Sequence, residues 1–386
     1  MTVADHDHIH AIPVSLLTGF LGSGKTTVLN HLLRHPNLAR TAIVINEFGE
    51  IGLDHELVEA ATENLVLLQS GCLCCTIRGD LVMTLHDLFD RRERGEIESF
   101  DRVIIETTGL ADPAAILHTL MTNAFTARTF RLDGVIVTVD AAAGAATLDA
   151  QEEAVKQAAM ADRILLTKTD LVEPGVVEVL ETRLRSLNPG APIARAHNGA
   201  VEASRLLNVG LYDPDSKSLD VQAWLNAEAY DGPGYHHAHD HTHDHHGHHH
   251  DHHDGSDGHH HHDHKHDVNR HDERISAVAY TVDEPISADA FDDWLETLMM
   301  VRGPNILRMK GIVNVEGVSS PFVLHGVQHV FHPPVLLQDW PSNDRRSRIV
   351  LIGRDLTEEF LTQSFGVLGG DGQHRRNHHA EAEHAA

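Results

Sequence analysis

Short apolar runs alternate with longer amphipathic stretches over the first two hundred residues. The apolar runs are rich in β-branched residues and typical of buried strands in a parallel sheet; they occupy residues 14–17, 42–45, 65–68, 102–105, 135–139, 164–166 and 192–194. The stretches between them are long enough for two or more helical turns, at residues 26–34, 80–92, 113–121, 151–160 and 176–187. Repeated strand-then-helix units predict a doubly wound, mostly parallel α/β domain over residues 12–210.

A different pattern begins at residue 274, where polar and apolar positions alternate and the loops are short. Strands are expected at residues 275–282, 306–315, 322–330 and 349–352. Ser287 can cap a helix that continues to Met300, and Thr357 lies near the start of a helix over residues 356–365. The short loops favour a mainly antiparallel sheet, so residues 274–368 are predicted to form a smaller α+β C-terminal domain.

The segment between these domains cannot build a core. Of the 35 His in the chain, 19 lie in residues 236–271, mixed with Asp and Gly and almost nothing apolar. We expect this His-rich segment, within a linker over residues 211–273, to be disordered without metal and to gather or buffer metal ions; the alternative is that it is only a solvated acidic linker. An expression tag is disfavoured, because the segment is internal and its longest His run, residues 259–262, is short. The polar N-terminus is assigned to residues 1–11 and a disordered tail to residues 369–386.

Net charge and cysteine usage narrow the class of protein. The formal charge of −27 would repel a nucleic-acid backbone, so nucleic-acid binding is not expected. The three Cys lie within four consecutive positions, which excludes a disulfide framework and suits a reducing compartment. No secretory signal and no apolar run of membrane-spanning length is found, so we predict a soluble cytoplasmic protein that is not bound to a membrane.

Residues 19–26 match G-x-x-x-x-G-K-[ST], directly after an apolar strand and before a helix. In this context the glycines let backbone N–H groups curl around a β-phosphate. Lys25 can neutralise the β- and γ-phosphates, and the hydroxyl of Thr26 can ligate Mg²⁺. The motif therefore predicts a P-loop NTPase fold for the first domain.

Residues 167–170 follow the strand expected at residues 164–166. A Lys-x-Asp in this position, here Lys168 and Asp170, can read guanine, because the carboxylate accepts from the ring N1–H and the exocyclic amine; this favours GTP over ATP. Guanine-reading loops usually begin with Asn, where this chain has Thr167.

Glu106 and Gly109 follow the strand expected at residues 102–105, where P-loop NTPases hold an acidic residue near Mg²⁺ and a glycine that senses the γ-phosphate. An ordinary strand-end carboxylate is the alternative for Glu106. The nucleotide-binding set is predicted to be Gly19, Gly22, Ser23, Gly24, Lys25, Thr26, Thr27, Gly109, Thr167, Lys168 and Asp170, with Lys25, Thr26 and Glu106 as the catalytic residues.

Cys72, Cys74 and Cys75 follow the strand expected at residues 65–68. Three thiols this close suit a soft metal such as Zn²⁺ and leave the fourth tetrahedral position for a carboxylate, His, water or incoming ligand. Such an open coordination shell suits metal transfer better than structural zinc, although buried Cys can also act as small hydrophobes. Glu47 ends the neighbouring strand and can approach either the metal or the nucleotide, unless residues 46–49 form a simple turn.

The order and spacing of residues 19–27, 46–49, 71–75, 106–109 and 167–170 resemble those of the CobW-type P-loop GTPases. Residues 274–365 are similar to the C-terminal domain of that family, and the C-x-C-C set is its most specific mark. The resemblance implies a GTP-hydrolysing metallochaperone, most often for zinc, in which the three cysteines carry the metal and GTP turnover governs delivery to a client metalloenzyme. Its cofactors would be GTP, Mg²⁺ and Zn²⁺, with Co²⁺ as the second candidate.

Other functions stay open on the sequence. The chain could deliver cobalt for cobalamin biosynthesis or to a cobalt enzyme, or act as a non-enzymatic His-rich metal buffer, although the intact Lys25, Thr26 and Glu106 argue against the buffer. A P-loop small-molecule kinase would need a second substrate pocket that the sequence does not reveal. The client, the physiological metal and a homo-oligomeric state are likewise open.

His325, His329 and His332 form a loose cluster in the second domain. On a strand the first two share a face and the third points away, so we favour a surface or client-contact role over a metal site.

Overall fold

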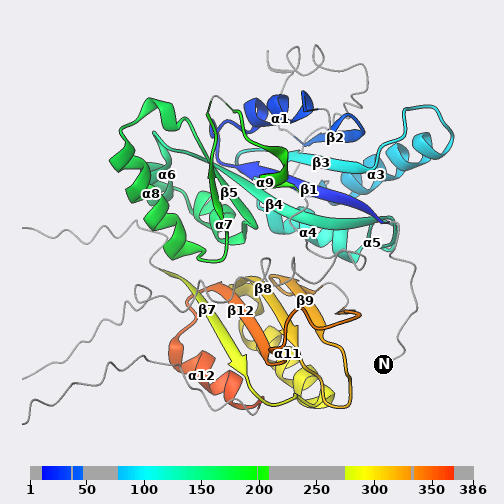
Figure 1. Cartoon of the computed structure of the whole chain (residues 1–386), viewed down its shortest axis with the longest axis vertical. Coiled ribbons are helices and arrows are strands. Elements are labelled where there is room, and N and C mark those ends of the chain that lie inside the picture. Colours follow the sequence, from blue (N-terminus) through cyan, green and yellow to red (C-terminus); the bar gives the residue numbers. More distant parts are fainter. Residues whose placement is uncertain are drawn as a thin grey trace, which may run out of the picture.

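The computed structural model describes residues 11–35, 38–46, 77–197, 199–207, 274–331 and 334–368. They form an N-terminal domain within residues 11–207 and a C-terminal domain over residues 274–368, stacked one above the other in Figure 1. The strand expected at residues 65–68, Glu47, the three cysteines, the His-rich segment and His332 lie outside the described residues.

A six-stranded parallel sheet organises the N-terminal domain, with the order β2-β3-β1-β4-β5-β6. Its strands are β1 (Ile12–Gly19), β2 (Thr41–Asn46), β3 (Arg102–Thr107), β4 (Phe130–Asp140), β5 (Arg163–Thr167) and β6 (Ile193–Arg195). The doubly wound parallel sheet predicted from the sequence is confirmed. Because β1 lies between β3 and β4, the chain changes direction across the sheet there, and ligands bind at such a point beside the carboxyl ends of the strands.

Helices cover both faces of this sheet. On one face lie α1 (Lys25–Leu33) and the short α9 (Ala203–Leu206). On the other lie α3 (Ile77–Glu93), α4 (Pro113–Thr122), α7 (Glu152–Met160) and α8 (Pro174–Leu187). The sequence also predicts five helices here, within a few residues of α1, α3, α4, α7 and α8; it missed α9 and three further short elements, α5 (Thr126–Thr129), α6 (Gly144–Ala150) and η3 (Thr169–Leu171).

Strand β4 begins five residues earlier than the run at residues 135–139 predicted. The early part contains Asp133, a charge that ordinarily argues against a buried strand. Here the Asp133 carboxylate accepts hydrogen bonds from Ser15 at 2.8 Å, on the adjacent strand β1, and from Arg102 at 2.6 Å, on β3 one strand further along the sheet. The buried charge is therefore paired, which lets the strand continue through it.

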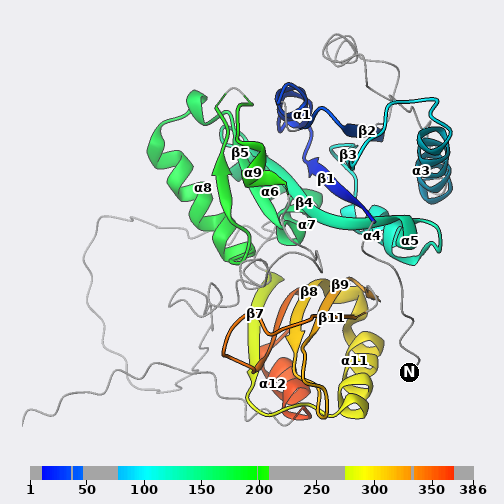
Figure 2. The same cartoon turned by 45° about the vertical axis from the view of Figure 1, so that its right-hand side comes forward.

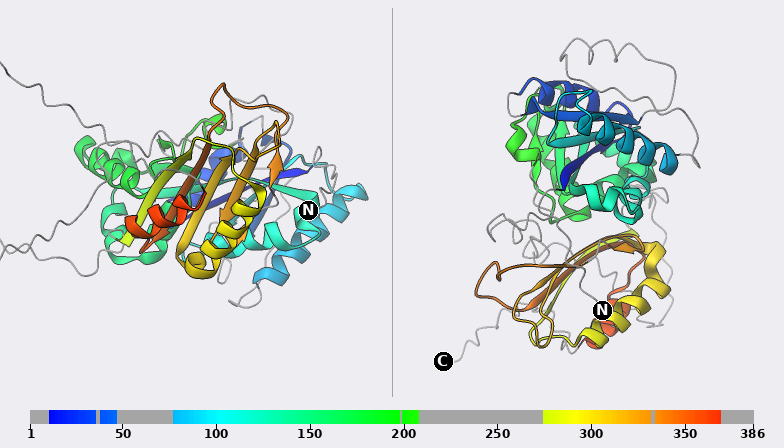
Figure 3. Two further views of the ribbon diagram at one scale, coloured as in Figure 1. Left: turned by 90° about the horizontal axis from the view of Figure 1, so that it is seen from below. Right: turned by 90° about the vertical axis from the view of Figure 1, so that its right-hand side faces the viewer.

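The C-terminal domain is an antiparallel sheet with the order β10-β9-β8-β12-β7 and with β11 paired to β9. Its elements are β7 (Ile275–Val282), α11 (Ala288–Arg302), η6 (Gly303–Asn305), β8 (Ile306–Val313), β9 (Phe322–Val327), β10 (Val330–Phe331), β11 (Val335–Leu336), β12 (Ser347–Arg354) and α12 (Glu358–Gly366). As predicted, Ser287 caps α11 and the Thr357 hydroxyl accepts from the N–H of Phe360 at the start of α12. Helices α11 and α12 pack against one face of the sheet, as the two views of Figure 3 show.

The prediction of one continuous strand over residues 322–330 is wrong. Strand β9 ends at Val327, and β10 turns back to pair with it, with Val330 opposite Val327. Gln328, with φ of 52°, lies in the turn between them. Non-glycine residues rarely adopt this backbone conformation, so Gln328 gave no sign of a turn in the sequence. The apolar residues on either side of it alternate as they would in one continuous strand.

The second face of the C-terminal sheet packs against the N-terminal domain. Val323 and Val327 of β9 and Val350 and Ile352 of β12 belong to the same hydrophobic cluster as α4 and α7. Figure 2 shows α4 and α7 facing β8 and β9. No helix in the described ranges is long and apolar enough to cross a membrane.

Candidate functional site

The loop between β1 and α1 has the backbone that its glycines permit. Gly19, Gly22 and Gly24 have φ of 143°, 72° and 89°, a region that side chains disfavour. A Cβ on Gly19 would also lie 2.3 Å from Oγ1 and 2.4 Å from the carbonyl oxygen of Thr138. The loop therefore requires glycine, and it leads directly into the N-terminus of α1, where backbone N–H groups favour an anion.

Three predicted residues come together beside this loop. The ammonium of Lys25, which is 9% exposed, donates to the carbonyl oxygens of Gly19 at 3.0 Å and Phe20 at 3.3 Å, so the cation is fixed at the loop. The hydroxyl of Thr26 donates to Oε1 of Glu106 at 2.8 Å. Glu106 reaches this position because β3 runs parallel to β1, with Glu106 opposite Leu17.

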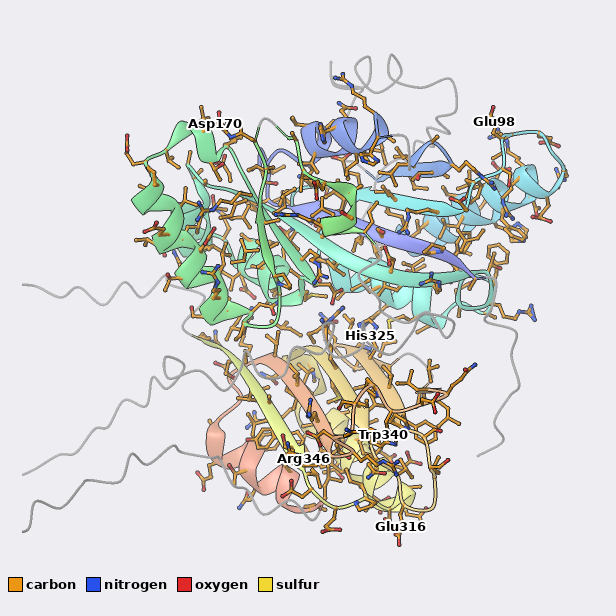
Figure 4. The ribbon with its side chains drawn as sticks, in the orientation of Figure 1. Glu98, Asp170, Glu316, His325, Trp340 and Arg346 are labelled. Carbon is orange, nitrogen blue, oxygen red and sulfur yellow. The ribbon has the colours of Figure 1, made fainter. Side chains whose placement is uncertain are left out.

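The expected base-reading loop lies at the carboxyl end of β5. Thr167, where guanine-reading loops usually have Asn, donates its hydroxyl proton to the Ser23 carbonyl at 2.7 Å and so ties this loop to the phosphate loop. Lys168 has φ of 54° and its ammonium lies 2.6 Å from Oδ2 of Asp140. Asp170 is exposed on η3, where its carboxylate can reach a ligand, and it is labelled in Figure 4.

Asp140 is a site residue that the sequence reasoning missed. It ends β4, beside β5 in the sheet, and its other carboxylate oxygen accepts from the N–H of Ala142 at 2.7 Å. This second contact orients the carboxylate that holds Lys168. A carboxylate directly after the apolar run at residues 135–139 was the only signal for it.

Gly109 lies against the phosphate loop. A Cβ on Gly109 would meet the backbone nitrogen of Leu21 at 2.5 Å and its Cα at 2.7 Å, so a side chain cannot fit there. The carbonyl of Gly109 accepts a hydrogen bond from Nε2 of Gln157, which the sequence reasoning also missed. Gly109 is thus placed to respond to a group bound at the phosphate loop.

Two other expected members of the site differ in exposure, since Ser23 is buried in the loop and Thr27 is exposed in the first turn of α1. The Ser23 hydroxyl lies 2.7 Å from Oγ1 of Thr138. Thr27 packs against Gly199, where an added Cβ would lie 2.9 Å from Cγ2 of Thr27.

The predicted metal ligands Cys72, Cys74, Cys75 and Glu47 stay predictions, since they lie outside the described residues. Within those residues, no group of three or more His, Cys, Asp or Glu could hold a metal ion.

The surface role expected for His325 is wrong. It lies on β9 and is only 7% exposed, between the two domains as Figure 4 shows. The residue faces inward because alternate positions of β9 contact the N-terminal domain. His329 lies nearby, with its ring centroid 4.9 Å from that of His118 in α4.

A buried ionic cluster joins the domains at this interface. Asp162 follows α7, and its fully buried carboxylate accepts from Arg308 at 2.7 Å and from Lys310 at 2.7 Å, both on β8. Burial opposes the charge on Asp162, but these two cations outweigh it and hold the pKa of this carboxyl well below its usual range. Burial lowers the pKa of Lys310 to about 8, although Asp162 partly offsets that effect.

Two family models match the chain. Residues 13–195 match the CobW/HypB/UreG nucleotide-binding domain, and residues 275–368 match the cobalamin synthesis protein cobW C-terminal domain. These ranges correspond to the parallel-sheet and antiparallel-sheet units of the structure.

Curated and solved relatives cover nearly the whole chain. The zinc chaperone YjiA of Escherichia coli is 30% identical over 93% of this chain and 99% of its own length, and the zinc chaperone CobW of Pseudomonas aeruginosa is 32% identical over 90% and 88%. The crystal structure of Zn(II)-bound YjiA GTPase from E. coli superposes with a TM-score of 0.64 at 27% identity, again over 93% and 99% of the two chains. With its phosphate loop, its two domains and these full-length relatives, the chain belongs to the CobW family of GTPases.

Proposed function

We propose that this GTPase of the CobW family carries Zn²⁺ on Cys72, Cys74 and Cys75 and couples GTP hydrolysis to the transfer of that zinc to a client metalloprotein. One observation supports the coupling most directly. Asn46 ends β2 opposite Thr107, the residue after Glu106. The segment with Glu47 and the thiols therefore starts next to the carboxylate that contacts Thr26.

The nucleotide half of the proposal follows from the charges and donors of the site. Lys25 neutralises the β- and γ-phosphates, while the glycine-rich loop presents its N–H groups to them. The Thr26 hydroxyl and the Glu106 carboxylate are oxygen donors, which suits Mg²⁺. When bound, Mg²⁺ supplies charge stabilisation for the transferred phosphoryl group.

The zinc half follows from the chemistry of the thiols. Three thiolates prefer Zn²⁺ to hard cations, and three ligands leave one position through which zinc can be handed on. Glu47 is the candidate for that position in one nucleotide state. The similarity to the zinc chaperones YjiA and CobW favours Zn²⁺ over Co²⁺ as the cargo, and a chaperone acts on another protein.

The remaining segments take supporting roles in this proposal. Residues 12–210 bind and hydrolyse GTP, and residues 274–368 form a module that rests on them. The His-rich segment at residues 236–271 gathers metal for the thiol site, since neutral imidazoles bind Zn²⁺. Competition between the protein and a chelator for zinc, with a GTP analogue or with GDP bound, tests the coupling directly.

Guanine selectivity gives the proposal a specific test in Asp170→Asn. The carboxylate accepts two hydrogen bonds from guanine, whereas the amide can accept from the ring N1–H and donate to the C2 carbonyl oxygen of xanthine. We expect GTP affinity to fall about 5- to 150-fold, the effect of one bidentate base contact, and affinity for xanthosine triphosphate to rise. Fluorescent-nucleotide titration measures both affinities.

Asp101→Asn is the matched control, because Asp101 is an exposed carboxylate that pairs with Arg40 away from the site. This variant should keep the nucleotide preference of the unmodified chain. Equal affinity of the unmodified protein for ATP and GTP would contradict the assignment of Lys168 and Asp170 to guanine.

A further inference from the structure

A single buried amide links the nucleotide site to a helix that supports the C-terminal domain. Gln157 lies in α7 with 1% exposure, and its Nε2 donates to the carbonyl oxygens of Gly109 at 3.2 Å and Ala111 at 3.0 Å. Its Oε1 is buried and receives no hydrogen bond within the part of the chain that the structure describes. Among those residues, the two loop carbonyls alone therefore fix the orientation of this amide.

The loop that Gln157 holds is in contact with the phosphate loop. Gly109 lies so close to Leu21 that a Cβ would meet the Leu21 backbone at 2.5 Å. Gly109 is buried at this contact, whereas the Leu21 side chain is 57% exposed, so the phosphate loop has free space on the solvent side but none toward Gly109. A movement of the phosphate loop toward Gly109 would therefore displace residues 109–111, and the hydrogen bonds of Gln157 would transmit that displacement to α7.

The two helices next to this loop, α4 and α7, both lie against the C-terminal sheet. Helix α4 begins directly after it, with Asp112 as its cap, and Nε2 of its His118 lies 3.0 Å from the carbonyl oxygen of Val327 in β9. Helix α7 ends two residues before Asp162, whose carboxylate pairs with Arg308 and Lys310 of β8. The loop at residues 109–111 is thus connected to β8 through α7 and to β9 through α4. Figure 1 shows both helices on the side of the N-terminal domain that faces the C-terminal sheet.

We propose that Gln157 is a positioning residue that makes the placement of β8 and β9 depend on the bound nucleotide, so that the C-terminal domain distinguishes the GTP state from the GDP state. The inference rests on the proposed function, since it takes the γ-phosphate as the group to which Gly109 responds. A purely structural Gln157 would stabilise both nucleotide states equally. A coupling Gln157 contributes a difference between them.

Hydrogen exchange followed by mass spectrometry tests this difference on the full chain. Peptides covering residues 306–327 should exchange about 5- to 150-fold differently with a non-hydrolysable GTP analogue than with GDP, the range typical of coupled sites. Gln157→Leu keeps the size of the side chain and removes both hydrogen bonds. We expect it to abolish the difference in residues 306–327 while the peptide covering residues 19–27 stays protected by either nucleotide.

Two controls separate coupling from loss of stability. Trp294→Phe removes the hydrogen bond from the indole to Ser364 on the far face of the C-terminal domain, so it should destabilise that domain but keep the nucleotide-dependent difference. Gln363→Leu makes the same chemical change as Gln157→Leu at an exposed position of α12 and should change nothing.

The outcomes distinguish this inference from the proposed function. Residues 19–27 protected by nucleotide, with identical exchange of residues 306–327 in both states of the unmodified chain, would overturn the inference alone. This comparison needs no variant and therefore stands even if Gln157→Leu does not fold. A difference that persists in a folded Gln157→Leu variant would also overturn the inference, whereas unprotected residues 19–27 would overturn the proposed function and the inference with it.

Discussion

Lys25→Ala is expected to lower the rate of GTP hydrolysis by at least about 10²- to 10³-fold, the loss found when one preorganised charge-stabilising group is removed from an active site. The ammonium of Lys25 is buried and fixed at the phosphate loop by the carbonyls of Gly19 and Phe20. It therefore costs no reorganisation when charge develops on the transferred phosphoryl group. Release of inorganic phosphate under single-turnover conditions, with nucleotide affinity measured separately, gives the chemical rate.

Lys156→Ala is the matched control for this prediction. Lys156 lies on α7 and pairs with Glu152 four residues away, a helix-surface contact of a few tenths of a kcal/mol. Its removal should leave hydrolysis near the level of the unmodified protein. An unchanged chemical rate in Lys25→Ala would exclude the catalytic role assigned to this phosphate loop.

Asp162→Asn is expected to lower the free energy of unfolding by about 3–5 kcal/mol, the usual effect of removing one partner from a buried ion pair. The amide has the shape of the carboxylate but leaves the cations of β8 without their counter-charge. Lys310 can relieve part of this cost by losing its proton, because burial already lowers its pKa to about 8. Arg308 is 1% exposed and cannot be deprotonated, so most of the cost arises there.

Urea denaturation followed by intrinsic tryptophan fluorescence measures this loss. Asp101→Asn provides the comparison, since the exposed pair of Asp101 and Arg40 should contribute at most about 1 kcal/mol.

The stability that Asp162 contributes should also depend on pH. The pKa of Asp162 is depressed in the folded protein, so its contribution to the free energy of unfolding is complete above the unfolded pKa of about 4 and is lost as the pH falls below it. The gap between Asp162→Asn and the unmodified protein should therefore narrow in acid, and a loss below 1 kcal/mol at neutral pH would contradict the proposed weight of this cluster.

The parts of the site that are contiguous in sequence could be predicted from it. The phosphate loop is one uninterrupted motif, and its glycines carry the positive φ values that the motif requires. The proximity of Thr26 and Glu106 could also be expected, because β1 and β3 are parallel and end at the same edge of the sheet. In the structure the Thr26 hydroxyl donates to the Glu106 carboxylate, so the two elements meet there.

Residues whose roles depend on spatial neighbours gave no local signal. Asp140 meets Lys168 only because β4 lies next to β5, and the apolar pattern does not specify strand order. Gln157 is one of several polar residues in the short helix α7, and nothing in the local sequence indicates that its side chain contacts the loop at residues 109–111. Arg308 and Lys310 alternate with apolar residues in β8, a pattern that predicts a sheet face exposed to solvent. In the structure the N-terminal domain covers that face.

The domain interface also explains the error over His325. A strand with one face on α11 and α12 would ordinarily expose its other face. In the structure the N-terminal domain covers that face, with Val323 and Val327 of β9 in one hydrophobic cluster with α4 and α7, and with Asp162 paired to Arg308 and Lys310 on the adjacent β8. Sequence periodicity identifies the two faces of a strand but cannot tell which partner, solvent or protein, each face meets.

The coupling of zinc binding to the nucleotide state is the central claim, and chelator competition measures it most directly. Zinc affinity is titrated against a chromogenic chelator with a non-hydrolysable GTP analogue and with GDP, on the full chain and on a variant without residues 236–271, so that the thiols can be separated from the His-rich segment. We expect the two affinities to differ by about 5- to 150-fold, and linkage requires zinc to change nucleotide affinity by the same factor. Cys74→Ala should remove the difference without removing nucleotide binding, whereas equal zinc affinity in both nucleotide states of the unmodified chain would contradict the proposed delivery mechanism.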